Sequence, residues 1–318
     1  MSALYPEIQP YDSGMLEVGD GNHVYWEVVG NPLGKPAVVF HGGPGSGASP
    51  GWRRYFNPER YRVVLFDQRN CGRSTPHASD PSIDLSTNTL PHLIGDAETL
   101  RRYLGIDRWL VLGASWGSTL GLAYAERHPE RVTEMVLFSI ATTTSREIDW
   151  ITNGVGAFFP EAWEQFRDAA LAIDDEPLVD AYARLLMSPD PVIHEQAARD
   201  WCDWEMAIVD IHPDHKPSTR YDDPRFRLAF ARLVTHYWSH RGWLEDNELL
   251  HNIGRIAEIP AVLIHGRLDV TGPIVTAWNL HRNWPTSRLI PVRGAGHDSR
   301  DPGMAESVVM ALDELSTT

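Results

Sequence analysis

Six short apolar runs, separated by turns and by stretches with helical spacing, constrain the fold of this chain most strongly. The runs do not alternate between apolar and polar residues, which is typical of strands buried on both faces of a sheet. Between them, the clearest helical pattern extends from His92 to Leu104, and another starts just after Ser115. Strands that alternate with helices indicate an α/β fold with a mostly parallel, doubly wound sheet. The six runs are residues 37–40, 62–66, 109–112, 135–138, 261–265 and 288–292.

Two segments near the N-terminus have a different pattern. Met15–Val18 and Val24–Val29 alternate better and flank the turn sequence Gly19-Asp-Gly21. They predict an antiparallel hairpin at one edge of the sheet.

The alternation of strands and helices stops between about Ile140 and Glu258. This stretch has the character of helices and loops and contains six tryptophans, and strands resume at Ala261. The sequence therefore predicts one α/β core, residues 1–140 and 250–318, that is interrupted by a helical cap domain, residues 141–249.

Composition excludes several classes of function. The chain has 318 residues, of which 42% are hydrophobic, and a formal net charge of −15. Such a charge disfavours binding to nucleic acid or to an anionic membrane surface. No window reaches the roughly 18 apolar residues of a membrane span, and the first 14 residues do not resemble a signal peptide, so we expect a cytoplasmic protein. Cys71 and Cys202 are too few for a disulfide framework.

The sequence Gly113-Ala-Ser-Trp-Gly117 follows one predicted strand and opens a helix. In that context a Gly-x-Ser-x-Gly match indicates a nucleophile elbow, because the glycines permit a sharp turn that leaves the serine hydroxyl exposed above the sheet. An ordinary strand–helix turn is the alternative interpretation. We take Ser115 as the candidate nucleophile.

A serine nucleophile needs a histidine base and a carboxylate that orients the histidine. Asp269 follows the predicted strand 261–265, and His297 lies in the glycine-rich loop after the strand 288–292. Taken singly, Asp269 could be a helix cap and His297 a surface residue. The order Ser115, Asp269, His297 nevertheless agrees with that of α/β hydrolases, and it predicts a catalytic triad.

Acyl transfer also needs donors for the developing oxyanion. The glycine-rich sequence His41-Gly-Gly-Pro-Gly45 comes directly after the strand 37–40. We expect the amide of Gly43 to act together with that of Trp116. Because His41 and His265 each end a strand and precede a glycine, we attribute structural hydrogen bonds to them and expect no metal site.

Motifs along nearly the whole chain resemble those of the proline iminopeptidase (prolyl aminopeptidase) family of α/β hydrolases. The resemblance implies removal of N-terminal proline from short peptides without a metal or cofactor. The motifs are His41-Gly-Gly-Pro-Gly45, Asp67-Gln-Arg-Asn-Cys-Gly-Arg-Ser74, Gly113-Ala-Ser-Trp-Gly-Ser-Thr-Leu120, Phe159-Pro-Glu-Ala-Trp163, Trp201-Cys-Asp-Trp-Glu205, His236-Tyr-Trp238, Leu244-Glu-Asp-Asn247, His265-Gly-Arg-Leu-Asp269 and Gly294-Ala-Gly-His297.

The resemblance also implies a set of substrate-binding residues. An aminopeptidase must bind a cationic α-amino group, which calls for carboxylates in a closed pocket with an apolar wall. Glu205 matches the family position that binds this amine, although from the residues alone a solvated glutamate is the better interpretation. Gly42, Trp204, His236 and Tyr237 are expected to contact substrate as well.

Two positions depart from the family pattern. Val234 stands where family members commonly carry a second amine-binding glutamate. Asn70 stands where glycine is usual, at a position that we expect to need a positive φ, which asparagine tolerates better than most residues. The loss of the acid keeps open an esterase or amidase acting on another small molecule, and a ligand receptor without activity is a third hypothesis. The expected partner is a short peptide or a small amide or ester, and the sequence does not indicate the oligomeric state.

Overall fold

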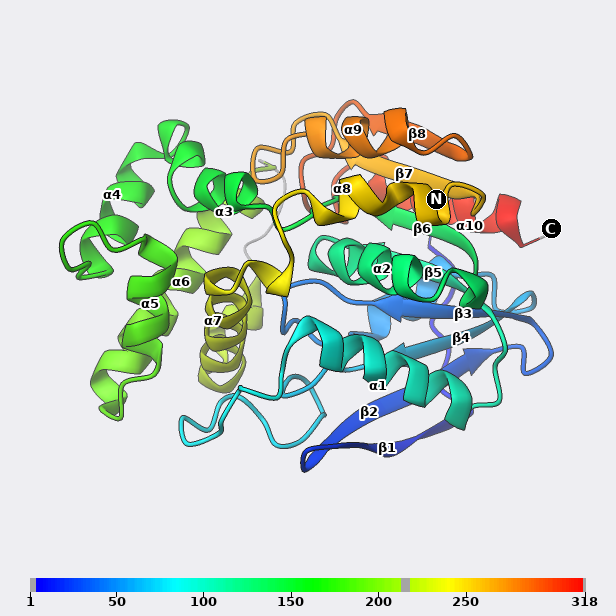
Figure 1. Cartoon of the computed structure of the whole chain (residues 1–318), viewed down its shortest axis with the longest axis horizontal. Coiled ribbons are helices and arrows are strands. Elements are labelled where there is room, and N and C mark those ends of the chain that lie inside the picture. Colours follow the sequence, from blue (N-terminus) through cyan, green and yellow to red (C-terminus); the bar gives the residue numbers. More distant parts are fainter. Residues whose placement is uncertain (1–3, 213–217, 317–318) are drawn as a thin grey trace.

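A computed structural model describes residues 4–212 and 218–316. Its centre is an eight-stranded sheet with the strand order β1-β2-β4-β3-β5-β6-β7-β8 (Figure 1). The pairs from β4 to β8 are parallel, whereas β1 pairs antiparallel with β2, and β2 with β4. The α/β fold and the hairpin at the sheet edge are thus confirmed. The strands are β1 (Asp12–Gly19), β2 (Asn22–Gly30), β3 (Lys35–Phe40), β4 (Tyr61–Phe66), β5 (Trp109–Ala114), β6 (Val132–Phe138), β7 (Ala261–Gly266) and β8 (Ser287–Val292).

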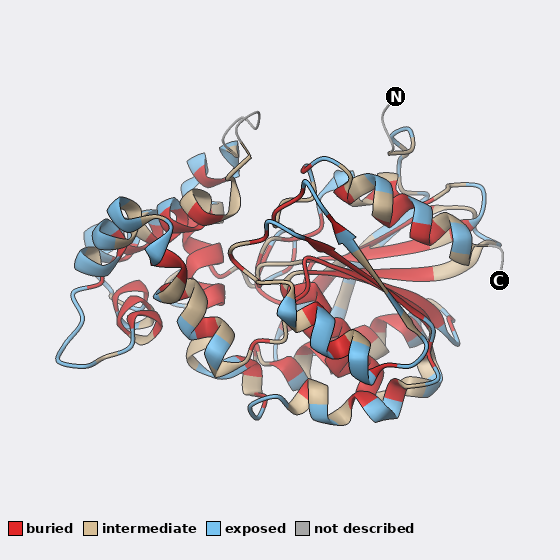
Figure 2. Ribbon diagram, turned by 90° about the horizontal axis from the view of Figure 1, so that it is seen from above, coloured by how far each residue is buried: buried red, intermediate tan, exposed pale blue. Residues whose placement is uncertain are grey.

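Strand β8 differs from the prediction. Its apolar run suggested burial on both faces, but Arg288 and Pro291 are exposed and Leu289 and Ile290 are only partly buried. The reason is its position at the end of the sheet, where β7 is its only neighbour. The more central β3, β5 and β7 are buried through most or all of their length (Figure 2).

Helices cover both faces of the sheet, and two separate apolar cores lie beneath them. Val38 and Phe40 of β3 belong to one core, and Val39 belongs to the other, because successive side chains of a strand point to opposite faces. The first core also contains residues of α1 (Leu90–Tyr103), α2 (Trp116–Arg127), α8 (Glu248–Asn252) and α9 (Val275–Asn283). The second contains residues of α10 (Met304–Leu315) and of the 3₁₀ helix η1 (Pro50–Tyr55).

Five further helices stand beside the sheet and pack around an apolar core of their own (Figure 1). They lie beyond the carboxyl ends of the parallel strands, where α/β proteins build their sites. Since α8 already packs against α2 and α9, the chain is back on the sheet layer by residue 248. The division into a core and a cap at 141–249 stays a prediction. The five helices are α3 (Ser145–Thr152), α4 (Pro160–Ala169), α5 (Leu178–Leu186), α6 (Pro191–Val209) and α7 (Pro224–Ser239).

Helix α7 is fixed to the loop between β4 and α1 by a buried arginine. The Arg232 guanidinium, in a residue that is 1% exposed, donates to the carbonyl oxygens of Ala78 and Asp80 at 2.6 Å and of Ile83 at 3.0 Å. Burial lowers the pKa of Arg232, and the charge is solvated by peptide dipoles instead of water. One side of the cap is thereby anchored to the core.

Within the described ranges, no helix is both long and apolar enough to cross a bilayer.

Candidate active site

Ser115 occupies the sharp turn between β5 and α2. Its φ of 53° and ψ of −124° lie outside the regions that most residues adopt. The flanking glycines make this turn possible: a Cβ on Gly117 would lie 1.9 Å from the carbonyl oxygen of Phe40, and one on Gly113 would lie 2.4 Å from that of Gly117. The strain and the close approach of the backbone are those of a nucleophile elbow.

The structure brings Ser115, His297 and Asp269 together from three separate loops. His297 Nε2 lies 3.1 Å from the Ser115 hydroxyl, and His297 Nδ1 lies 2.7 Å from Asp269 Oδ2. The other carboxylate oxygen of Asp269 accepts hydrogen bonds from Thr271 and from the amide of Gly272. These contacts leave one tautomer of His297, with the proton on Nδ1 and a free electron pair on Nε2 facing the serine.

The charges of this group support that arrangement. Burial alone would raise the pKa of Asp269, but His297 acts against it through charge and a hydrogen bond and lowers the pKa to about 2. Burial would lower the pKa of His297, but Asp269, with help from Glu205, raises it above its usual value. Asp269 therefore stays ionised, and the imidazolium that forms when His297 takes a proton is stabilised.

His265 supports the acid loop. Its Nδ1 accepts a hydrogen bond from the amide of Ile140 at 3.1 Å, so Nε2 carries the proton. That proton is donated to the carbonyl oxygen of Gly272 at 2.6 Å, and Nε2 also lies 3.4 Å from Asp269 Oδ2. Burial lowers the pKa of His265, which favours this neutral form. The ring thus ties the loop that carries Asp269 to the end of β6.

Gly43 and Trp116, the two expected oxyanion donors, border the same cavity as Ser115. His41 Nε2 accepts a hydrogen bond from the amide of Gln68, so its Nδ1 donates to the carbonyl oxygen of Gly42 at 2.9 Å. Because the peptide unit is planar and trans, this contact directs the amide hydrogen of Gly43 away from His41.

One side chain joins the two donors. Gln68 donates to the carbonyl oxygen of His41 at 2.9 Å and accepts from the indole of Trp116 at 3.0 Å. The loop that carries Gly43 and the start of α2 are therefore held by a single buried network. Sequence analysis did not assign a role to Gln68; its place in the Asp67–Ser74 motif was the available signal.

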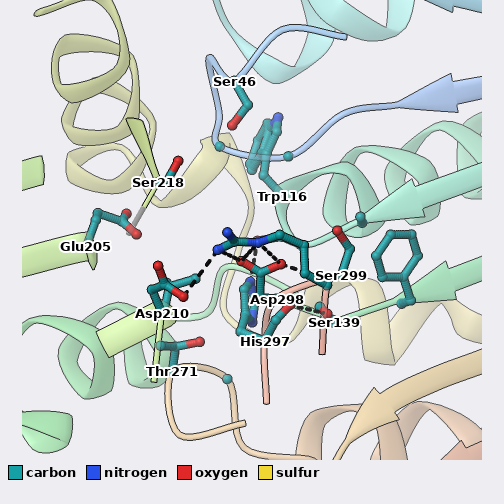
Figure 3. A pocket seen from close by; sticks show the side chains of 18 of the residues that line it. Ser46, Trp116, Ser139, Glu205, Asp210, Ser218, Thr271, His297, Asp298 and Ser299 are labelled. Atoms are coloured by element: carbon teal, nitrogen blue, oxygen red, sulfur yellow. Dashed lines mark hydrogen bonds and ion pairs between the residues drawn. The ribbon is translucent and has the colours of Figure 1, made fainter. Parts of the chain in front are cut away.

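A cavity of about 940 Å³ is lined by Ser115 and His297; Figure 3 shows it from close by, with His297 and Glu205 labelled. Gly42 and Gly43 also line it, as do Trp52 and Tyr55 of η1. Apolar side chains of α3, α6 and α7 contribute to its wall: Ile148, Ile151, Met206, Phe226, Phe230 and Trp238. Within the described ranges, no group of three or more histidine, cysteine or acidic residues is arranged to hold a metal ion.

Comparisons with known proteins identify the family. Residues 35–301 match the model of the alpha/beta hydrolase fold family. The probable proline iminopeptidase of Streptomyces coelicolor is 52% identical over 99% of this chain and 98% of its own length, and the proline iminopeptidase of Arabidopsis thaliana is 45% identical over 98% and 82%. This chain belongs to the proline iminopeptidase family.

A solved structure agrees with the fold of this family member. The crystal structure of the proline iminopeptidase of Mycobacterium smegmatis superimposes with a TM-score of 0.65, covering 96% of this chain and 99% of that one. At 20% sequence identity this likeness concerns the fold alone.

Glu205 is the acidic residue that the proline iminopeptidase resemblance assigned to the substrate amine. It lies on α6, lines the cavity and is 9% exposed (Figure 3). Within the described residues its carboxylate makes no hydrogen bond or ion pair. Burial raises the pKa of Glu205, while the charges of Arg220 and His297 lower it. A largely buried carboxylate that faces a cavity is a place where a cationic ligand gains a charge-assisted contact.

Three residues expected to contact substrate do not line the cavity. Trp204 stacks on Phe166 with ring centroids 5.1 Å apart and donates to the carbonyl oxygen of Ile151, so it is part of the cap core. His236 and Tyr237 both contact Asn88 instead. His236 Nε2 lies 3.0 Å from the carbonyl oxygen of Asn88, and the Tyr237 hydroxyl donates to Asn88 Oδ1 at 2.5 Å. Contact of these three residues with substrate stays a prediction, because a motif does not tell which face of α6 or α7 its residues occupy.

The cavity-facing side of α7 is made of other residues. Phe226, Phe230 and Trp238 line the cavity and are spaced by multiples of four. Val234 completes this row, but it is fully buried in the cap core. The α7 wall is therefore apolar at the position where proline iminopeptidases commonly carry a second acid. This row of spacing four was visible in the sequence and could have identified the wall.

Asn70 has a φ of 62°, as expected from its replacement of glycine. Its side chain donates to Asn22 at 3.1 Å and to the carbonyl oxygen of Pro76 at 2.9 Å. It also accepts a hydrogen bond from Asn88 at 2.9 Å. The substitution thus keeps the left-handed turn of this loop and adds three hydrogen bonds to it.

Proposed function

We propose that this protein is a serine aminopeptidase that releases N-terminal proline from short peptides, as its family indicates. The observation that supports the proposal is the largely buried carboxylate of Glu205, which has no partner among the described residues, in the cavity that Ser115 and His297 also line. A substrate ammonium would be the cationic partner of this carboxylate. The apolar side chains of Phe230 and Trp238, which line the same cavity, suit a pyrrolidine ring.

The proposed reaction begins with attack of Ser115 Oγ on the prolyl carbonyl carbon, while His297 Nε2 takes the hydroxyl proton. Asp269 holds the imidazole in place and stabilises its positive charge. The amides of Gly43 and Trp116 donate to the oxyanion of the tetrahedral intermediate. His297 then gives its proton to the leaving nitrogen, the C–N bond breaks, and a prolyl ester of Ser115 remains.

A water molecule completes the cycle. His297 takes a proton from the water as it attacks the ester carbonyl, and returns it to Ser115 Oγ when the C–O bond breaks. Free proline leaves with both its ammonium and its carboxylate. In this scheme the substrate is a short peptide or a related small amide.

The buried, free thiols of Cys71 and Cys202 support the further proposal of a cytoplasmic location.

Three substrates test the proposal: a prolyl arylamide, its N-blocked analogue and a short-chain aryl ester. We expect the free prolyl arylamide to be the best substrate by kcat/KM, because only it pairs an ammonium with Glu205 while it presents a proline ring. A preference for the blocked amide or for the ester would refute the aminopeptidase and favour the alternative hydrolase. Absence of turnover, together with absence of fluorophosphonate labelling at Ser115, would indicate a receptor.

A further inference from the structure

Two arginines line the cavity, and they differ in their partners. Arg300 lies 2.7 Å from Asp298 and 3.2 Å from Asp210, so its charge is already paired (Figure 3). Arg220 makes no ion pair within the described ranges of the chain, although acidic side chains border the same cavity. The cavity therefore presents a cation at Arg220 as well as an anion at Glu205.

Arg220 is held in place by aromatic rings. It belongs to the 3₁₀ helix η4 (Thr219–Asp222), and its guanidinium carbon lies 4.5 Å from the ring centroid of Tyr221, 5.5 Å from that of Phe230 and 5.6 Å from that of Phe226. One N–H group donates to the hydroxyl of Tyr221. Stacking occupies the face of a guanidinium and leaves its in-plane N–H donors available, which is the geometry that binds a carboxylate.

The two charged groups act on each other without forming an ion pair. Arg220 is the strongest charge acting on Glu205, where it opposes the effect of burial on the pKa. A dipeptide, which spans about 7 Å at most when extended, carries an ammonium at one end and a carboxylate at the other. Its two ends are complementary to a carboxylate and a guanidinium that line one cavity.

The geometry points to Arg220 as the binding site for the terminal carboxylate of a short peptide whose ammonium pairs with Glu205. Prolyl dipeptides are then the preferred substrates, because arylamides carry no terminal carboxylate and longer chains carry it farther from the prolyl amine. This inference rests on the proposed aminopeptidase function and adds to it the length and the charge of the substrate.

The test compares Pro-Gly with its amide, Pro-Gly-NH2, in the wild-type protein and in Arg220→Met. The wild type should hydrolyse the acid with a kcat/KM roughly five- to tenfold higher, the effect of one charge-assisted contact at a partly exposed site. Arg220→Met should remove this preference by lowering the value for the acid alone. Any change in the ionisation of Glu205 affects kcat/KM for both compounds equally, because both carry the same prolyl amine. It therefore cancels from the ratio of the kcat/KM value for the acid to that for the amide.

Arg225→Met is the matched control, since Arg225 is exposed at the start of α7, does not line the cavity and carries the same charge. It should keep the preference for the acid. Fluorophosphonate labelling of Ser115 at the wild-type rate checks that Arg220→Met is folded.

Equal hydrolysis of acid and amide by the wild type would overturn the inference, and so would a preference that survives in Arg220→Met. An equal loss for both compounds would also overturn it, because Arg220 would then act only by holding Glu205 ionised. If neither compound nor a prolyl arylamide released proline while an ester was hydrolysed, the proposed function itself would fail.

Discussion

Gln68 contacts both segments that carry the proposed oxyanion donors, the loop of Gly43 and the start of α2. Replacing it with leucine keeps the volume but removes the contacts to the His41 carbonyl and to the Trp116 indole. We expect kcat to fall by roughly 10- to 100-fold with little change in KM, because the donors act mainly in the transition state. Steady-state kinetics with a prolyl arylamide measures this effect.

Gln196→Leu is the control for that substitution, because the side chain of this exposed glutamine of α6 hydrogen-bonds, among the described residues, to Asp200 alone. It should leave both constants unchanged. A rise in KM at constant kcat for Gln68→Leu would mean that the network orients substrate instead of the oxyanion donors.

Glu205 should influence the pH dependence of the reaction even for substrates without an amine. The base His297 works when neutral, and the negative charge of Glu205 contributes to its raised pKa. Glu205→Gln should lower that pKa, so the acid limb of kcat/KM for a neutral ester should move to lower pH. The same change should raise KM for prolyl arylamides far more than for esters.

The exposed Glu195 of α6 provides the matched charge control as Glu195→Gln, for which no displacement of the acid limb is expected. An unchanged or upward-shifted acid limb in Glu205→Gln would contradict the assigned interaction with His297.

At the scale of elements, the anchoring of α7 is the contact between cap and core that can be tested most directly. Arg232→Met removes the donor from the buried carbonyl oxygen of Ala78 and from the part-buried carbonyl oxygens of Asp80 and Ile83. We expect the free energy of unfolding to fall by about 3 kcal/mol or more, which is the range for breaking a buried polar network. Thermal unfolding measures the loss. Arg225→Met on the same helix should leave the free energy of unfolding nearly unchanged. If Arg232→Met were as stable as the wild type, the hydrogen bonds of Arg232 would contribute nothing to stability.

The sequence predicted the elements of the sheet layer well because each of them has a strong local signal. The runs at 37–40 and 109–112 and the helix at 92–104 correspond to β3, β5 and α1 with small differences at their ends. Strand β8 was misjudged because apolar residues do not reveal whether a strand has one neighbour or two. The cap could only be predicted as helical, since its helices bury their faces against one another and not against a regular sheet.

The candidate site divides in the same way. Ser115, Asp269 and His297 could be placed from the sequence because each follows a strand, and the carboxyl ends of parallel strands meet at one edge. His236 and Tyr237 could not, because their roles depend on how α7 is rotated about its axis. Two contacts between residues far apart in sequence fix that rotation: Arg232 with the carbonyl oxygen of Ala78, and Tyr237 with the side chain of Asn88.

At the scale of the whole molecule, a buried acid should make stability depend on pH. Glu126 of α2 is 4% exposed, and its Oε1 has no hydrogen-bond partner within the described residues. Burial raises its pKa from 4.5 to about 8, with further effects of Arg127, Glu248 and Arg255. The folded protein therefore holds this proton more tightly than the unfolded chain does, so the stability from this group is full below about pH 4.5 and is lost as the pH rises through about 8.

Glu126→Gln should consequently raise the melting temperature at pH 9, and the gain should shrink towards pH 4.5. Thermal unfolding across this range measures the difference, and the exposed Glu130→Gln serves as the charge control. A gain that stays constant with pH would mean that the amide improves packing and that the ionisation of Glu126 is not the cause.

The hydrogen bonds of Arg232 that anchor α7 also have a consequence for inhibitor design. A rigid apolar group placed against Phe230 and Trp238 meets a surface on α7, the helix that is anchored to the core. An ammonium group meets Glu205 on α6, a helix that packs mainly against α4, α5 and α7. The apolar half of such a compound therefore has the better-fixed receptor surface, and chemical optimisation is best started there.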